Sequence, residues 1–216
     1  MNKLPCLDKS DPDQLWRPSP PDGRLPAQEI NVWRVSLEQP VECVERLSRI
    51  LSTDERMRAE RFHFDRERKR FIVSRGALRT ILGRYLGVGP DQLRFRYGPH
   101  GKPCLSEEFD RCALGFNLAH SNDLALYAFA SGRKVGIDVE HVHPIPDAEQ
   151  IAARFFSKYE NAVLRELPES QRLEAFFNCW TRKEAFIKAI GDGLTSSLGP
   201  ISSFAGPRRT GAIAER

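Results

Sequence analysis

Apolar and polar positions alternate between the period of a strand and that of a helix along most of the chain. Period-two alternation predicts strands at residues 30–35, 93–97, 116–120 and 124–130, and spacings of three and four predict helices at 41–49, 53–61, 67–86 and 173–191. Thr53 is placed to cap the second helix, and Gly87 closes the third. This order predicts an α+β fold with mostly antiparallel pairing.

Residues 135–140 predict a further strand with an unusual acidic face. Alternate side chains of a strand share a face, so Asp138 and Glu140 would point one way while Val135, Ile137 and Val139 point the other. Two neighbouring carboxylates repel, and an oxygen-preferring divalent ion such as magnesium would relieve that repulsion. Taken alone, an Asp-x-Glu pair is more often a solvated strand edge, so the metal hypothesis needs a third acid.

The third acid is Glu184, inside the apolar stripe of helix 173–191. That stripe consists of Leu173, Phe176, Phe177, Trp180, Ile187 and Gly191. A carboxylate in such a stripe needs a cation or hydrogen-bond donors. An ordinary ion pair between Glu184 and Lys188, one turn later, is the alternative. Together with Asp138 and Glu140, however, a three-carboxylate metal site beside a lysine for a phosphate oxygen is the better explanation.

The 216-residue chain has a formal net charge of +4, and much of its positive charge gathers between residues 56 and 79. That set comprises Arg56, Arg58, Arg61, Arg66, Arg68, Lys69, Arg70, Arg75 and Arg79. Phosphate or an acidic protein is the expected partner. An RNA-binding domain ranks lower, because acidic residues are interleaved and the phenylalanines fit a helix core.

The first 28 residues carry six prolines and few aliphatic side chains, which predicts a flexible leader outside catalysis. No run approaches the roughly 20 apolar residues of a membrane span, and the N-terminus lacks a signal-peptide pattern. We therefore expect a cytoplasmic protein without a membrane partner.

Four segments together resemble one enzyme family. W-T-R-K-E-A-F-I-K at 180–188 resembles the W-x-x-K-E-x-x-x-K signature of 4'-phosphopantetheinyl transferases, and G-I-D-V-E at 136–140 resembles their G-I-D-x-E. G-K-P at 101–103 and F-N-L-A-H-S at 116–121 resemble two further segments, G-K-P and F-N-x-S-H-S. Their order matches the family, and the resemblance, to the larger, monomeric surfactin-synthetase-activating type, spans about residues 29–193.

The resemblance implies a 4'-phosphopantetheinyl transferase fold of two similar α+β halves related by a pseudo-twofold, with coenzyme A between them. We place the halves at 29–115 and 116–216. It also implies the reaction: the phosphopantetheine arm of coenzyme A moves, with Mg2+, onto a serine of an acyl or peptidyl carrier protein, and adenosine 3',5'-bisphosphate is released. A monomer that binds no nucleic acid is expected.

The resemblance further implies roles for individual residues. Magnesium would be held by Asp138, Glu140 and Glu184, Lys188 would contact a phosphate oxygen, and Glu184 or a metal-bound water would take the serine proton. The coenzyme-binding residues would be Arg56, Arg58, Arg70, Gly101, Lys102, Pro103, His120 and Lys188, with His120 at the 3'-phosphate and Gly101, Lys102 and Pro103 beside the adenine. For Lys183, an ion pair with Asp138 or Glu140 is as plausible as a ligand contact.

Two features depart from the family pattern. Ala119 replaces a serine, which removes one hydroxyl contact worth about 0.5–1.5 kcal/mol. Residues 195–216 show no strand alternation, so the C-terminal half is either naturally shortened or altered by truncation or a shifted reading frame. Alternatives to an active transferase are a non-catalytic carrier-protein-binding relative and a basic RNA-binding domain. The presence of all three acids and Lys188 favours the active enzyme.

Overall fold

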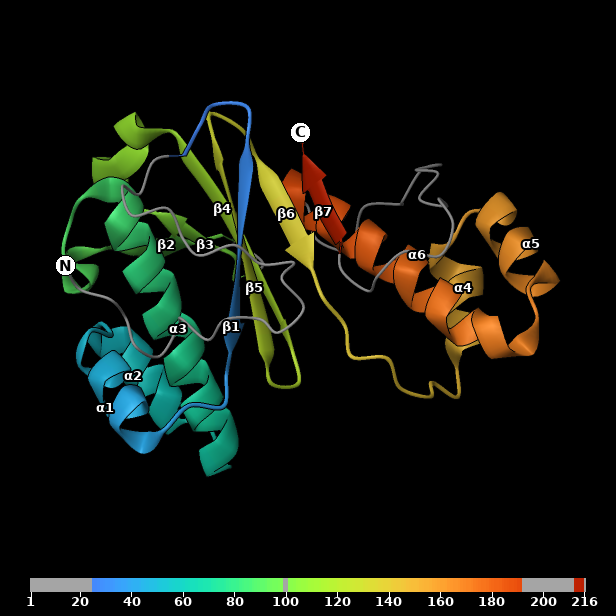
Figure 1. Ribbon diagram of the computed structural model, residues 1–216, viewed down its shortest axis with the longest axis horizontal. Coiled ribbons are helices and arrows are strands. Elements are labelled where there is room, and N and C mark those ends of the chain that lie inside the picture. Colours follow the sequence, from blue (N-terminus) through green and yellow to red (C-terminus); the bar gives the residue numbers. More distant parts are fainter. Residues whose placement is uncertain (1–24, 99–100, 192–211, 216) are drawn as a thin grey trace. The chain divides into compact units, whose positions relative to one another are not determined.

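The structure is a computed structural model that describes residues 25–98, 101–191 and 212–215. The chain divides into two compact units (Figure 1). The first contains residues 33–113 and 123–125, and the second contains residues 30–32, 114–122 and those from 126 onward. The predicted leader, residues 1–28, lies almost entirely outside the described residues, and the division into halves at 29–115 and 116–216 stays a prediction.

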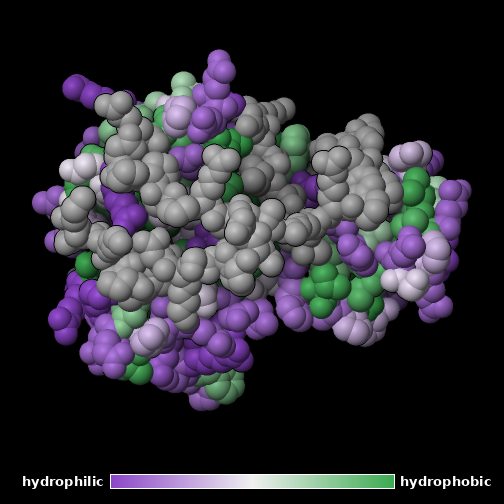
Figure 2. All heavy atoms as spheres, viewed as in Figure 1, coloured by the Kyte–Doolittle hydropathy of each residue, from purple (hydrophilic) through white to green (hydrophobic). Residues whose placement is uncertain are grey.

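The first unit is built around helix α3. Its elements are most of β1 (Ile30–Ser36), α1 (Val41–Arg49), α2 (Thr53–Glu60), α3 (Asp65–Leu86), η1 (Pro90–Gln92), β2 (Phe95–Tyr97), β3 (Pro103–Leu105) and η2 (Glu107–Cys112). Helix α3 buries Leu78, Ile81 and Leu82 completely, and α1 contributes the buried Leu47. Apolar burial of this kind is the main stabilising contribution. Figure 2 shows that the visible surface around α1 and α2 is mostly hydrophilic.

Most predicted boundaries in this unit are confirmed, with one wrong cap. Helix α1 spans the predicted residues, and α3 ends at Gly87, whose φ of 67° is left-handed. The N-cap of α2 is Ser52 rather than Thr53, and the Ser52 backbone N–H donates to Glu55 Oε2 at 3.1 Å. Glu55 at the third helical position satisfies an otherwise unpaired amide, which selects Ser52 as the cap.

The second unit surrounds helix α6. It contains β4 (Leu114–Ser121), β5 (Leu124–Ser131), β6 (Val135–Asp138), α4 (Ala148–Phe155), α5 (Lys158–Glu166), α6 (Glu169–Ile190) and β7 (Ala212–Glu215). One sheet has the strand order β1-β5-β4, and β6 pairs with β7 in another. The predicted α+β class with antiparallel pairing is confirmed. No helix among the described residues is long and apolar enough to cross a membrane.

Two expectations for the second unit are wrong. The C-terminal segment does contain a strand, because β7 pairs antiparallel with β6 and Gly136 lies opposite Ala214. Its Ala-Ile-Ala-Glu sequence gives no clear alternation, so pairing with the edge of β6 and not local pattern determines it. The acidic strand ends at Asp138, two residues before Glu140, and it is buried on both faces. The predicted strand is therefore two residues too long, and Glu140 lies in the segment that follows it.

Candidate active site

Asp138 lies at the end of β6 and is the most buried of the predicted metal ligands. Only 3% of its surface is exposed. Its Oδ1 accepts a hydrogen bond from Lys188 Nζ of α6 at 2.6 Å, while its Oδ2 is buried without a hydrogen-bond partner. A buried carboxylate oxygen without a donor is costly, so this position favours a further cation.

Glu140 follows β6 and is held from another strand. Ser121 Oγ at the end of β4 donates to Glu140 Oε2 at 3.1 Å, and the His141 backbone N–H donates to the same hydroxyl oxygen at 2.9 Å. Burial raises the pKa of Glu140, and the negative charge of Asp138 raises it further. Its position therefore depends on contact with β4 and not on strand alternation alone.

Glu184 lies on α6, four residues before Lys188, and is half-buried. Burial raises the pKa of its carboxyl group, and the charges of Asp138 and Glu140 raise that pKa further. The three carboxylates thus repel one another electrostatically in the folded chain. Among the described residues, no group of three or more His, Cys, Asp or Glu side chains is arranged so that it could hold a metal ion. The Lys188 ammonium group instead lies against Asp138.

Lys183 takes part in a different contact from the one considered in the sequence analysis. Its Nζ lies 2.8 Å from Glu160 Oε2 on α5, and the two side chains are 2% and 0% exposed. Glu160 also accepts from the Ser157 backbone N–H at 2.7 Å, as part of the cap of α5. The expected pairing with Asp138 or Glu140 is therefore wrong, since Lys183 lies on the side of α6 that packs against α5.

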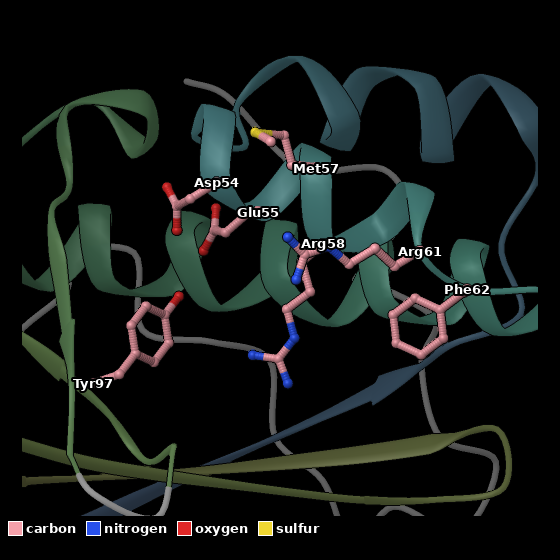
Figure 3. A pocket seen from close by; sticks show the side chains of 7 residues that line it. All are labelled: Asp54, Glu55, Met57, Arg58, Arg61, Phe62 and Tyr97. Carbon is pink, nitrogen blue, oxygen red and sulfur yellow. The ribbon is translucent and has the colours of Figure 1, made fainter.

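The first unit has a pocket of about 690 Å³ beside α2 (Figure 3). It is lined by Asp54, Glu55, Met57, Arg58, Arg61, Phe62 and Tyr97. Arg58, one of the predicted coenzyme-binding residues, extends from α2 toward this space, and its guanidinium group also lies 5.5 Å from the Phe71 ring centroid. The pocket thus combines guanidinium groups with aromatic rings.

The negative charge of Glu55 in the pocket wall is more than balanced by buried arginines. Arg75 donates to Glu55 Oε1 through Nε and Nη2, and Arg79 Nε donates to Glu55 Oε2 at 2.6 Å. Arg75 also donates to the Tyr97 hydroxyl oxygen at 3.0 Å, and burial raises the pKa of Tyr97. Two guanidinium groups against one carboxylate leave a positive excess, which favours an anionic ligand.

The other predicted coenzyme-binding residues of the first unit have varied surroundings. Arg56 donates to the Leu51 carbonyl oxygen at 2.7 Å, next to the start of α2. Arg70 lies 3.7 Å from Glu38, and its side chain is 19% exposed. In the loop before β3, the Gly98 N–H donates to the Lys102 carbonyl oxygen, the Gly101 N–H donates to that of Gly98, and Pro103 begins the strand.

The second unit contains His120 as well as the acidic residues. His120 is exposed near the end of β4, whereas the preceding Ala119 is only 4% exposed. Sequence reasoning did not identify Arg61, Phe62 and Tyr97 as pocket residues or Ser121 as the donor to Glu140. The available signal for Ser121 was its place directly after His120 in the F-N-L-A-H-S segment.

Comparisons with known proteins agree with this arrangement of motifs. The model of the 4'-phosphopantetheinyl transferase superfamily matches residues 134–214, and that of the 4'-phosphopantetheinyl transferase N-terminal region matches residues 32–132. The chain is 47% identical to the 4'-phosphopantetheinyl transferase HetI of Nostoc sp., over 83% of this chain and 76% of the relative. It is 30% identical to the 4'-phosphopantetheinyl transferase Sfp of Bacillus subtilis, over 81% of this chain and 75% of the relative.

The chain therefore belongs to the 4'-phosphopantetheinyl transferase family. The predictions of this family, of its α+β fold and of an enzyme are confirmed. A putative 4'-phosphopantetheinyl transferase of Synechocystis sp. is also similar, at 35% identity over 82% of this chain and 70% of the relative. These matches include both units, since they cover most of the chain.

Proposed function

We propose that this chain transfers the 4'-phosphopantetheine arm of coenzyme A to a serine hydroxyl of an acyl or peptidyl carrier protein and releases adenosine 3',5'-bisphosphate. The observation that carries the proposal is the pairing of Asp138 with Lys188 beside Glu140 and Glu184. Transfer from a pyrophosphate requires positive charge at phosphate oxygens and a base for the attacking hydroxyl. This part of the second unit offers both kinds of group.

The acidic residues suit a divalent ion such as Mg2+ by the chemistry of their donors, and their side chains would have to move closer together to share it. Asp138, Glu140 and Glu184 supply only oxygen ligands, and Asp138 Oδ2 is buried without a hydrogen-bond partner. Bound there, the ion would offset the negative charge of the pyrophosphate. The raised pKa values of Glu140 and Glu184 support this assignment, because a cation would favour their charged forms.

Lys188 and Glu184 would act directly on the reacting groups. The Lys188 ammonium group, with its side chain 31% exposed, can exchange its contact with Asp138 for a phosphate oxygen. By family resemblance, Glu184 or a metal-bound water next to it is the candidate acceptor of the serine proton.

Residues of the first unit are proposed contacts for the nucleotide end of coenzyme A. Arg58 and the pocket beside α2 offer guanidinium groups for phosphate and the rings of Phe62 and Tyr97 for stacking. By family resemblance, Gly101, Lys102 and Pro103 would lie at the adenine and His120 at the 3'-phosphate. Arg70 and Arg56 complete the proposed set, although the Arg56 contact with Leu51 suits a structural role equally well.

Other functions receive less support. Part of the positive charge of the basic segment is engaged within the first unit, because Arg66 pairs with Glu38 and both Arg68 and Lys69 pair with Asp65. This weakens the case for RNA binding, which depends on available positive charge. A carrier-binding relative without activity would have no use for the acidic residues around Lys188.

The decisive experiment is intact-mass spectrometry of an apo carrier protein incubated with this chain, coenzyme A and Mg2+. The proposal expects the mass to rise by one phosphopantetheine arm and the rise to disappear with a chelator. Asp138→Asn and Glu184→Gln should abolish the transfer, whereas the matched carboxylate variant Glu107→Gln, at an exposed position, should not. Absence of transfer to several carrier proteins by a folded chain that binds coenzyme A would favour the inactive relative.

The contribution of His120 can be separated from overall folding by changing the substrate. His120→Ala should raise the KM for coenzyme A more than the KM for dephospho-coenzyme A, because only the former carries a 3'-phosphate. Equal changes for both substrates would contradict this role. Lys158→Gln, at an exposed position of α5 in the same unit as His120, is the control for loss of a positive charge.

A further inference from the structure

Gly136 lies in the middle of β6 at a point where the strand directly contacts the backbone of α6. A Cβ atom at Gly136 would lie 1.9 Å from the Ala185 carbonyl oxygen and 2.5 Å from the Ala189 nitrogen. Real Cβ atoms essentially never approach other heavy atoms within 3.0 Å. Any other residue at position 136 would therefore push the strand and helix apart by about 1 Å or more.

The contact between Gly136 and α6 is next in the chain to the acidic and basic residues of the candidate site. Ala185 directly follows Glu184, and Ala189 directly follows Lys188, so the contact covers the helical turn that joins these two residues. On the strand, Asp138 is two positions after Gly136 and therefore shares its face. The distance between strand and helix at Gly136 thus directly affects the distance from Asp138 to Lys188.

The remaining contacts of this segment leave little freedom for adjustment. Ala185 and Ala189 are 0% and 1% exposed, so this face of the helix is closely packed. On the strand, the Ile137 backbone N–H donates to the buried Asn117 Oδ1 at 3.0 Å, which links β6 to β4. A displacement of α6 would consequently be transmitted to Glu184 and Lys188 and not absorbed locally.

We propose that Gly136 is a positioning residue: its missing side chain lets α6 rest on β6 at the distance that brings Lys188 and Glu184 to Asp138. The inference deepens the proposed function and rests on it for its catalytic consequence. If the helix moved by about 1 Å, the Asp138–Lys188 contact of 2.6 Å would lengthen to about 3.6 Å, beyond normal hydrogen-bond distance. Displacements of that size in a reacting site can cost about 100-fold in rate.

The test compares Gly136→Ala with a glycine variant that has an equally severe clash away from α6. Gly115 on β4 is the matched control, because a Cβ there would lie 2.0 Å from the Arg133 carbonyl oxygen in the same unit. Both variants should lower the melting temperature. Measured per folded molecule, kcat should fall about 100-fold in Gly136→Ala and by no more than about twofold in Gly115→Ala.

A second readout does not depend on activity. A double-mutant cycle of Asp138→Asn and Lys188→Met, followed by urea unfolding, measures how strongly the two side chains stabilise each other. The cycle is measured first with Gly136 and then in the G136A background. We expect the two substitutions to be coupled by about fivefold in the unfolding equilibrium constant with glycine, and by no more than about twofold with alanine. If G136A does not fold, Ala189→Ser, which adds one atom at the same buried turn, replaces it in both measurements.

The outcomes separate the inference from the proposed function. Unchanged coupling in the G136A background, or equal effects of the two glycine variants on kcat, would overturn the role of Gly136. Absence of transferase activity in the unaltered chain would overturn the proposed function, and the coupling measurement would still decide whether Gly136 sets the distance between Asp138 and Lys188.

Discussion

Replacement of Lys183 by methionine should strongly destabilise the second unit while leaving coenzyme binding intact. Lys183 Nζ and Glu160 Oε2 lie 2.8 Å apart, and both side chains are almost completely buried. Methionine occupies a similar volume but has no charge, so Glu160 would remain as an uncompensated buried carboxylate. Removal of one partner from such a pair typically costs about 3–5 kcal/mol.

The double variant Lys183→Met with Glu160→Gln tests the cause of that loss. The glutamine amide oxygen can still accept from the Ser157 backbone N–H, which stabilises the start of α5. Without the buried charge, the double variant should regain at least half of the lost free energy of unfolding. The double variant therefore distinguishes an unpaired charge from a simple loss of packing.

The assay is urea unfolding followed by far-UV circular dichroism, together with coenzyme A affinity measured by calorimetry under folding conditions. An unchanged unfolding midpoint in Lys183→Met would refute the reasoning. So would a double variant that is less stable than the single one. A fall in coenzyme A affinity without a loss of stability would instead indicate that Lys183 contacts the ligand.

Three further predictions concern other ion pairs and the pocket. Glu55→Gln should lower the free energy of unfolding, measured with urea, by about 3–5 kcal/mol, because two buried arginines lose their shared carboxylate. A loss below about 1 kcal/mol would contradict this prediction. Hydrogen bonds from Lys69 and then Arg68 lower the pKa of Asp65 below its usual value of 3.8. The charged Asp65 carboxylate therefore stabilises the fold above pH 3.8, and this stabilisation is lost as the pH falls through the folded-state pKa. An NMR titration midpoint at or above 3.8 would be inconsistent with this prediction. Arg58→Gln should weaken coenzyme A binding about tenfold by calorimetry, and unchanged affinity would remove the pocket from the coenzyme site.

Local pattern was sufficient to predict most of the elements. Helix α1, the end of α3 at Gly87 and strands β4 and β5 follow from periodicity and from the conformational freedom of glycine. The segments around Asp138 and Glu184 also identify the family by themselves, because several short motifs occur in one order. Such features depend on neighbouring residues in the chain, so the sequence alone predicts them.

Tertiary structure decided which partners these residues have. Lys188 contacts Asp138, fifty residues away, and Lys183 pairs with Glu160 on a different helix. Helical spacing predicts which side chains share a face of α6 but not which element packs against that face. Strand β7 likewise depends on the edge that β6 offers and not on its own pattern.

The close approach at Gly136 illustrates the same division. A glycine in a strand is visible in the sequence, but only the packed structure reveals that the backbone of α6 occupies the space where a side chain would be. The sequence by itself determined the candidate ligands, the signature motifs and most elements, because these rest on local spacing. Only the tertiary structure decided the distances, charge partners and burial of those ligands, because they depend on contacts between segments far apart in the chain.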